Sequence, residues 1–96
     1  MYARMHKMGG DMILAACDEE LLGAFLEEGG RRLEVSESFY SGTALGEEEL
    51  AEWMRSASSM NLIGNTAVGV AVKEGYAVPE QAFEICGVKY LTVVMM

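Results

Sequence analysis

The N-terminal sixteen residues constrain the fold most, because their pattern is that of two β-strands joined by a tight turn. Residues 1–8, MYARMHKM, alternate between two faces, and Tyr2, Arg4 and His6 share one of them. This alternation is typical of a β-strand. The turn signal Gly9-Gly10-Asp11 follows, and the apolar run over residues 12–16 predicts a returning strand. We therefore expect a β-hairpin at the N-terminus.

Three later segments have the features of helices. In the first, Asp18 occupies an N-cap position, Gly29-Gly30 would end the helix, and the apolar stripe consists of Leu21, Leu22, Phe25 and Leu26. The second begins at residues 47–49, three glutamates that suit the positive end of the helix dipole. The third is entered through residues 61–65 and ends at Gly75.

Three further strands complete the pattern. We expect them at residues 31–36, 82–86 and 88–94, and residues 42–46 are expected to form a loop. The resulting order is ββαβααββ within one domain that covers residues 1–96. This order favours an α+β fold (α/β-like), with a single mixed β-sheet and helices packed on it.

Charge and cysteine content restrict the class of partner. The 96-residue chain has a formal net charge of −8, which disfavours extended nucleic-acid binding and contact with an anionic membrane. Its apolar runs are shorter than the roughly 20 residues that a membrane-spanning helix needs. Cys17 and Cys86 are far apart and lack a CxxC spacing, which suits a reducing compartment. We therefore expect a cytoplasmic protein.

The sequence offers little material for catalysis. His6 is the only histidine, which argues against a catalytic triad or a histidine-rich metal site within one chain. The acidic clusters at residues 18–20 and 47–49 are explained by their expected positions at helix starts. The sequence therefore predicts no catalytic residue, no metal site and no cofactor, and it favours a protein that is not an enzyme.

Two polar segments could bind a small molecule or an anion. The first contributes Ser36, Glu37, Ser38 and Tyr40, and the second, an expected helix start with free N–H groups, contributes Asn61, Gly64 and Asn65. If the two segments converge, they form a polar pocket. Alternatively, the serines cap a turn, Phe39 and Tyr40 fill the core, and Asn61 caps its helix. Both interpretations stay open at this point.

Two other features suggest interactions with larger partners. The cations of the first third of the chain, Arg4, Lys7, Arg31 and Arg32, flank two predicted strands that could be neighbours, so we expect a local basic patch. The apolar segment over residues 90–96 could pair across subunits, which predicts a homo-oligomer through the C-terminal strand.

Five segments together resemble the small archaeal proteins of domain-of-unknown-function family 424. They are HKMGGD (6–11), AACDEELLG (15–23), LEVSESFYSG (33–42), NLIGNTAV (61–68) and ICGVKY (85–90). The resemblance implies a small archaeal and cytosolic protein, and it implies no particular activity. Family members often have Pro-His where this chain has Lys89-Tyr90, and an acid where Asn65 stands, so histidine chemistry at that place does not carry over.

Two functions are consistent with these patterns. The first is a non-catalytic interaction module of information processing, linked to translation or the ribosome, whose basic patch contacts RNA or an acidic protein. Its partner would be a protein or a ribonucleoprotein. The alternative is a small-molecule or anion-binding protein, and potentially an enzyme, with a pocket between residues 36–40 and residues 61–65.

Overall fold

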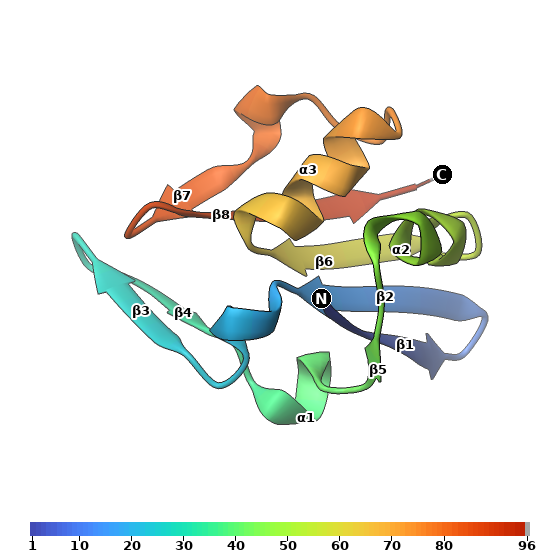
Figure 1. Ribbon diagram of the computed structural model, residues 1–96, viewed down its shortest axis with the longest axis horizontal. Helices are drawn as coiled ribbons and strands as arrows, with labels where there is room; N and C mark the ends of the chain where they lie inside the picture. The colour runs from blue at the N-terminus through green and yellow to red at the C-terminus, as the bar shows by residue number, and fades with distance from the viewer. Residues whose placement is uncertain (96) are drawn as a thin grey trace.

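The computed structural model describes residues 1–95 and consists of a mixed β-sheet with helices packed on it (Figure 1). The six strands of the sheet lie in the order β5-β1-β2-β6-β8-β7, and β3 and β4 form a separate hairpin. The strands are β1 (Tyr2–Met8), β2 (Asp11–Cys17), β3 (Phe25–Glu28), β4 (Arg31–Glu34), β5 (Thr43–Ala44), β6 (Ser59–Ile63), β7 (Phe83–Ile85) and β8 (Val88–Val94). The helices are α1 (Glu37–Tyr40), α2 (Glu47–Met54) and α3 (Asn65–Lys73), with 3₁₀ turns η1 (Glu19–Leu21) and η2 (Pro79–Gln81). The α+β class predicted from the sequence is confirmed.

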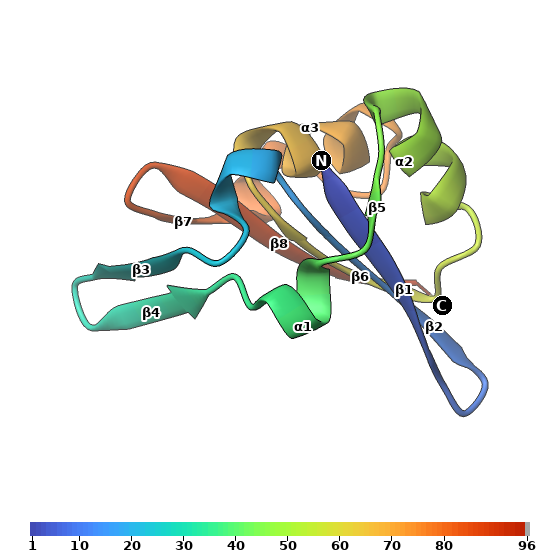
Figure 2. The same ribbon diagram turned by 60° about the horizontal axis from the view of Figure 1, so that its bottom comes forward.

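The two faces of the sheet carry separate apolar clusters because side chains alternate along each strand. Helices α2 and α3 pack on one face, over residues such as Leu14, Met60 and Leu91. The hairpin β3–β4 and helix α1 lie on the other face, where the cluster includes Cys17 and Tyr40 (Figure 2). The sheet is therefore packed by two helices on one face and by a hairpin and a short helix on the other.

The expected N-terminal hairpin is confirmed. Strands β1 and β2 pair in register from Tyr2 opposite Cys17 to Met8 opposite Asp11. Strand β2 then pairs in parallel with β6, while β8 pairs antiparallel with β6 and β7. The sheet is thus mixed, and its only parallel pair among the described residues lies at its centre.

The helix predicted to follow Asp18 is wrong. Only the 3₁₀ turn η1 forms there, and Phe25 and Leu26 belong to strand β3. Gly23 interrupts the helical spacing, with a positive φ of 86° and an N–H that donates to the carbonyl of Val35 at 2.8 Å. The apolar spacing that suggested a helix is therefore used by a turn and a hairpin.

Two other boundaries differ from the sequence-based expectation. Residues 59–63 form the central strand β6 and not the entry to a helix, so α3 begins only at Asn65, with Gly64 as its N-cap. The third expected strand ends at Glu34, and residues 37–40 form α1. The expected order ββαβααββ is present, with η1 in the place of the first helix and with β3, α1, β5, β6 and η2 as additional elements. Within residues 1–95, no helix is both long and apolar enough to cross a membrane.

Candidate functional site

A cleft of about 440 Å³ lies between the hairpin β3–β4 and the hairpin β7–β8. One set of side chains comes from β4 and the other from the β7–β8 pair; the lining residues are Arg31, Arg32, Phe83, Ile85 and Tyr90. The lining thus includes two arginines and two aromatic residues. This combination of cationic and aromatic side chains is the reason for treating it as the candidate site.

Both hairpins that form the cleft have two-residue turns with positive φ at both central positions. These residues are Gly29 and Gly30 in the first hairpin, with φ of 56° and 83°, and Cys86 and Gly87 in the second, with φ of 53° and 77°. Such turns match the right-handed twist of the flanking strands. The local sequence thereby fixes the register that places Arg31 and Tyr90 on their strands.

The tips of the two hairpins are linked to each other. The N–H of Cys86 donates to Oε1 of Glu28 at 3.0 Å, and Sγ of Cys86 donates to the carbonyl of Glu27 at 3.5 Å. The residues joined by these two bonds are separated by 58 and 59 positions in the sequence. The bonds connect the β3–β4 hairpin to the β7–β8 hairpin, which belongs to a different sheet, and so fix the two sides of the cleft relative to each other.

The aromatic wall presents a stacked pair. Phe83 and Tyr90 lie directly opposite each other on β7 and β8, with ring centroids 5.6 Å apart and an interplanar angle of 29°. Phe83 is 57% exposed, so much of its ring faces solvent. A large exposed aromatic side chain beside arginines is typical of an interaction surface.

The positive charge of the cleft is partly balanced by nearby carboxylates. Arg32 Nε donates to Glu27 Oε2 at 2.9 Å across the hairpin, and both side chains are exposed. Arg31 also borders a smaller cavity of about 240 Å³ that Glu28, Gly29 and Glu84 line. An exposed ion pair of this kind contributes little to stability and can exchange partners. The arginines are therefore available to an anionic ligand that enters the cleft.

The polar segment over residues 36–40 bonds mainly within itself. Ser36 caps α1 by accepting the N–H of Phe39 at 3.2 Å, and the Oγ atoms of Ser36 and Ser38 are 3.4 Å apart. Tyr40 is buried in the cluster beneath α1, and the Glu37 carboxylate lies beside Gly23. These placements match the structural interpretation of the segment.

The second polar segment is divided between β6 and α3. Asn61 Oδ1 accepts from the hydroxyl of Thr92 at 3.2 Å, on the sheet. Asn65 joins α3 to β8, since its Nδ2 donates to the carbonyl of Gly87 and its Oδ1 accepts the N–H of Lys89. The N–H of Gly64 donates to the Lys89 carbonyl at 2.8 Å. None of these hydrogen bonds joins one segment to the other.

The start of α3 is already occupied by a carboxylate of the chain itself. Asp18, which is buried, accepts the N–H of Thr66 at 3.1 Å and the N–H of Ala67 at 2.8 Å. Asp18 was expected to cap a helix of its own, but it caps α3 from 48 positions away. A Cβ on Gly64 would overlap this carboxylate, so the close approach requires glycine there.

The predicted basic patch is divided. Strand β1 has β2 and β5 as neighbours, whereas β4 pairs with β3, so the expectation that these two cationic strands are neighbours is wrong. Arg4 donates to the carbonyl of Ser38 at 3.3 Å, and Lys7 projects from the opposite face of β1 because side chains alternate along a strand. Only Arg31 and Arg32 remain together, in the cleft.

Two buried groups near the cleft are kept in their neutral forms. Burial, assisted by the neighbouring Asp18, raises the pKa of the Cys17 thiol to about 11. Burial also raises the pKa of Tyr40 to about 12, with Cys17 and Tyr90 nearby. A thiol with such a pKa is protonated at neutral pH and is a poor nucleophile.

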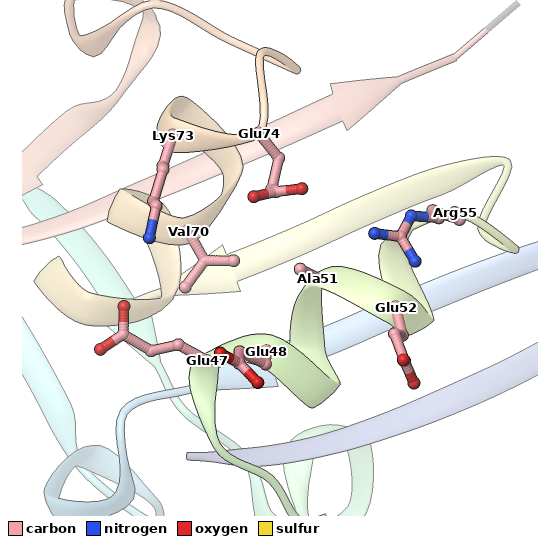
Figure 3. A pocket seen from close by; sticks show the side chains of 8 residues that line it. All are labelled: Glu47, Glu48, Ala51, Glu52, Arg55, Val70, Lys73 and Glu74. Atoms are coloured by element: carbon pink, nitrogen blue, oxygen red, sulfur yellow. The ribbon is translucent and has the colours of Figure 1, made fainter.

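A second hollow lies between α2 and α3. Figure 3 shows Glu47, Glu48, Glu52 and Glu74 interspersed with Arg55 and Lys73 around a cavity of about 280 Å³. The mixed charges give it no strong preference for one ligand. Among residues 1–95, no group of three or more histidine, cysteine, aspartate or glutamate side chains is placed to hold a metal ion.

The fold and the cleft define a small α+β protein with a mixed sheet and a peripheral site lined by arginine and aromatic residues. Residues 6–96 match the family described as "Protein of unknown function (DUF424)", and the chain belongs to this family. It is also similar to the crystal structure of an uncharacterized conserved protein from Methanopyrus kandleri. That likeness has 31% sequence identity and a TM-score of 0.84, and covers 99% of this chain and 92% of the other. No curated protein matches this chain.

Sequence reasoning found one side of the cleft and missed the other. Arg31 and Arg32 were candidates, but Phe83, Ile85 and Tyr90 were not. A usable signal was present, because Phe83 and Tyr90 are equally spaced from the two-residue turn at Cys86-Gly87 and must face each other across it.

Proposed function

We propose that this protein is a non-catalytic interaction module of information processing, linked to translation or the ribosome, and that it contacts RNA through the arginine–aromatic cleft. The observation that carries the proposal is the placement of Arg31 and Arg32 beside the stacked rings of Phe83 and Tyr90. Unpaired RNA bases stack on aromatic side chains, while arginine pairs with phosphate.

The charge of the protein limits the size of this contact. With a net charge of −8, the molecule as a whole repels a phosphate backbone, and only a local cationic site can oppose that repulsion. Two arginines can neutralise about two phosphates. The proposed ligand is therefore one or two unpaired nucleotides of a larger ribonucleoprotein, and not a long duplex or single strand.

Other groups that could have served catalysis have structural partners, which supports a binding role. The His6 ring stacks on Phe39 with centroids 4.5 Å apart, and its Nε2 donates to the Phe39 carbonyl at 2.9 Å. The alternative function is small-molecule or anion binding in a pocket between residues 36–40 and residues 61–65. It has less support because the Asp18 carboxylate accepts two of the N–H groups at the start of α3.

The proposal can be tested by fluorescence anisotropy with labelled six-nucleotide RNAs of adenosine and of uridine. Phe83→Leu keeps an apolar side chain and removes the stacking surface, so we expect affinity to fall about 5- to 160-fold, the range of base–aromatic stacking. Phe25→Leu is the matched control, since Phe25 is 58% exposed and Phe83 57%. Arg31→Ala removes a cation of the cleft and should weaken binding. Arg55→Ala is its matched control, because Arg55 lies at the hollow between α2 and α3.

The salt dependence provides a second measurement. Neutralisation of two phosphates predicts a slope of about −1.4 for the logarithm of the association constant against the logarithm of salt concentration. Failure of both RNAs to bind at 50 mM salt, or equal losses for Phe83→Leu and Phe25→Leu, would refute the proposal. Co-purification with ribosomal particles from a native lysate, lost in Phe83→Leu, tests the link to translation.

A further inference from the structure

A free sheet edge on β1, remote from the cleft, carries a second inference. Strand β5 pairs only with Tyr2 and Ala3, so β1 continues from Arg4 to Met8 without a strand on its outer side. Figure 1 shows this half of β1 extending past β5 at the lower edge of the sheet. We propose that this edge binds an extended acidic peptide, which adds to the sheet as a further strand beside β1.

The hydrogen bonds at the start of β1 show which backbone groups face outward. Met1 and Leu45 exchange two bonds, from the Leu45 N–H to the Met1 carbonyl at 2.7 Å and from the Met1 amino group to the Leu45 carbonyl at 3.1 Å. Outward and inward groups alternate along an antiparallel strand. The N–H and C=O of Met5 and Lys7 therefore face outward, where β5 no longer reaches.

An apolar cavity lies beside the same edge, on the helix-covered face. Its volume is about 400 Å³, and its lining residues are Met5, Met12, Glu52, Trp53 and Ser56. Met5 contributes both an outward-facing backbone and a side chain to this cavity. Strand addition combines main-chain hydrogen bonds with pockets for alternate side chains, and this edge offers both. A methionine-lined pocket also accommodates different aliphatic side chains.

The charges of β1 select the type of peptide. The strand YARMHKM contains two cations, Arg4 and Lys7, and no acidic residue, in a protein whose net charge is −8. Lys7 is exposed, and within residues 1–95 no carboxylate forms an ion pair with it. Carboxylates on a bound peptide would meet these cations at close range, where pairing outweighs the screened repulsion from the rest of the molecule.

The same charges oppose a second copy of the chain as the occupant. Pairing of two β1 edges about a two-fold axis would bring their cationic side chains together, and like charges directly opposite each other destabilise a strand pair. Exposed lysine on an edge is a known protection against such self-association. An acidic peptide removes the repulsion, whereas a second β1 strand adds to it.

The test uses a labelled, end-blocked peptide of four Glu-Val repeats and measures its binding by fluorescence anisotropy. The valines that enter the Met5 cavity place the glutamates on the other face of the strand, beside Arg4. Arg4→Glu should therefore weaken binding about tenfold or more, because a like charge replaces an opposite one. Lys73→Glu makes the same charge change at an exposed site on α3 and should leave binding unchanged. Met5→Pro removes one outward N–H and should abolish binding; its fold is checked by circular dichroism.

Three peptide controls separate strand addition from general attraction. A peptide with N-methyl groups on alternate residues has the same charge but cannot pair with an edge, and it should not bind. Eight glutamates should bind more weakly than the Glu-Val repeat, because they leave the Met5 cavity empty. Four Lys-Val repeats should not bind.

Four results would overturn the inference. They are equal effects of Arg4→Glu and Lys73→Glu, binding of the N-methylated peptide, no binding of the Glu-Val peptide up to millimolar concentration, or a dimer in sedimentation that Arg4→Glu strengthens. The last result would assign the edge to a second copy of the chain. Because RNA is absent from this assay, its outcome is independent of the proposed function.

Discussion

Replacing Asp18 by alanine tests how α3 is attached to the sheet. In the native structure the buried carboxylate of Asp18 accepts the N–H groups of Thr66 and Ala67, at 3.1 and 2.8 Å. These are two of the N–H groups that a helix start leaves without an intrahelical partner. The carboxylate also lies at the positive end of the α3 dipole. The substitution therefore removes an acceptor and a favourable charge at one position.

The expected cost follows from the groups left without partners. Loss of an N-cap side chain costs about 0.5–2 kcal/mol at ordinary sites. Each buried N–H that becomes unsatisfied adds about 1–3 kcal/mol unless water reaches it. We therefore expect Asp18→Ala to lower the free energy of unfolding by about 3 kcal/mol. For a chain of this size, that loss lowers the melting temperature by about 12 °C or more.

Gly64 provides an internal check on this explanation. Gly64→Ala is expected to be destabilising for two reasons, a φ of +116° that alanine rarely adopts and the overlap of its Cβ with the Asp18 carboxylate. In the double variant Asp18→Ala/Gly64→Ala, the Cβ added at position 64 no longer overlaps a carboxylate, so the Gly64 substitution costs only the backbone strain. The two losses should therefore sum to more than the loss of the double variant, by about 1–3 kcal/mol.

Urea denaturation followed by the fluorescence of Trp53, on α2, measures all four proteins of this cycle. Asp18→Asn should fall between the wild type and Asp18→Ala, because its amide oxygen can replace only one of the two acceptors. A loss below about 1 kcal/mol for Asp18→Ala would show that water or another group satisfies the N–H donors. If the losses of unfolding free energy for Asp18→Ala and Gly64→Ala are additive, then the Asp18 carboxylate does not lie against Gly64.

Three further results are expected. The pKa of Cys17 is raised to about 11 and that of Tyr40 to about 12, so both groups ionise at lower pH in the unfolded chain than in the folded protein. The free energy of unfolding should therefore be constant below about pH 9 and fall by about 2 kcal/mol per group by pH 12. Urea titrations at several pH values measure this decline, and Cys17→Ala should flatten its first part. Gly42→Ala should destabilise strongly, because its Cβ would overlap the Ala3 carbonyl, whereas Gly69→Ala, with open space around it in α3, should stabilise by about 0.5–1 kcal/mol in thermal melts; equal effects would contradict this. Formate can take the place of the missing carboxylate at the start of α3 in Asp18→Ala. With a dissociation constant near 0.1 M for formate, 0.5 M formate should raise the free energy of unfolding of this variant by about 1 kcal/mol. An equal increase in the wild type would show that formate does not act at the start of α3.

The parts of the fold that depend on local pattern could be predicted from the sequence. The alternation of residues 1–8 and the turn after it predicted the β1–β2 hairpin, and Gly87 marked the turn between β7 and β8. The segment after Asp18 failed because its four apolar residues fit one helix face and also fit a turn followed by a strand. Tertiary pairing with β4 decided between the two, and that pairing is invisible to helical periodicity.

The candidate site residues show the same division. Ser36 was correctly considered as a cap, because capping acts over three residues. The acceptor for the α3 N–H groups could not be predicted, since Asp18 lies 48 positions away from Thr66. The cleft likewise requires β4 and β7 to lie close together. The only local sequence signal for it is the spacing of Phe83 and Tyr90, which pair across a short turn.

The occupied start of α3 explains why the best-supported sites lie at the periphery of the sheet. In open α/β sheets, ligands commonly bind beyond the carboxyl ends of parallel strands, beside a helix N-terminus. Here the parallel strands β2 and β6 end at Cys17 and Ile63, and the next residue of β2, Asp18, takes the place that an anionic ligand would occupy. A protein that satisfies this position with its own carboxylate stabilises its sheet at the expense of an anion site. The two binding surfaces that we propose, the arginine–aromatic cleft and the free edge of β1, both lie away from this occupied position.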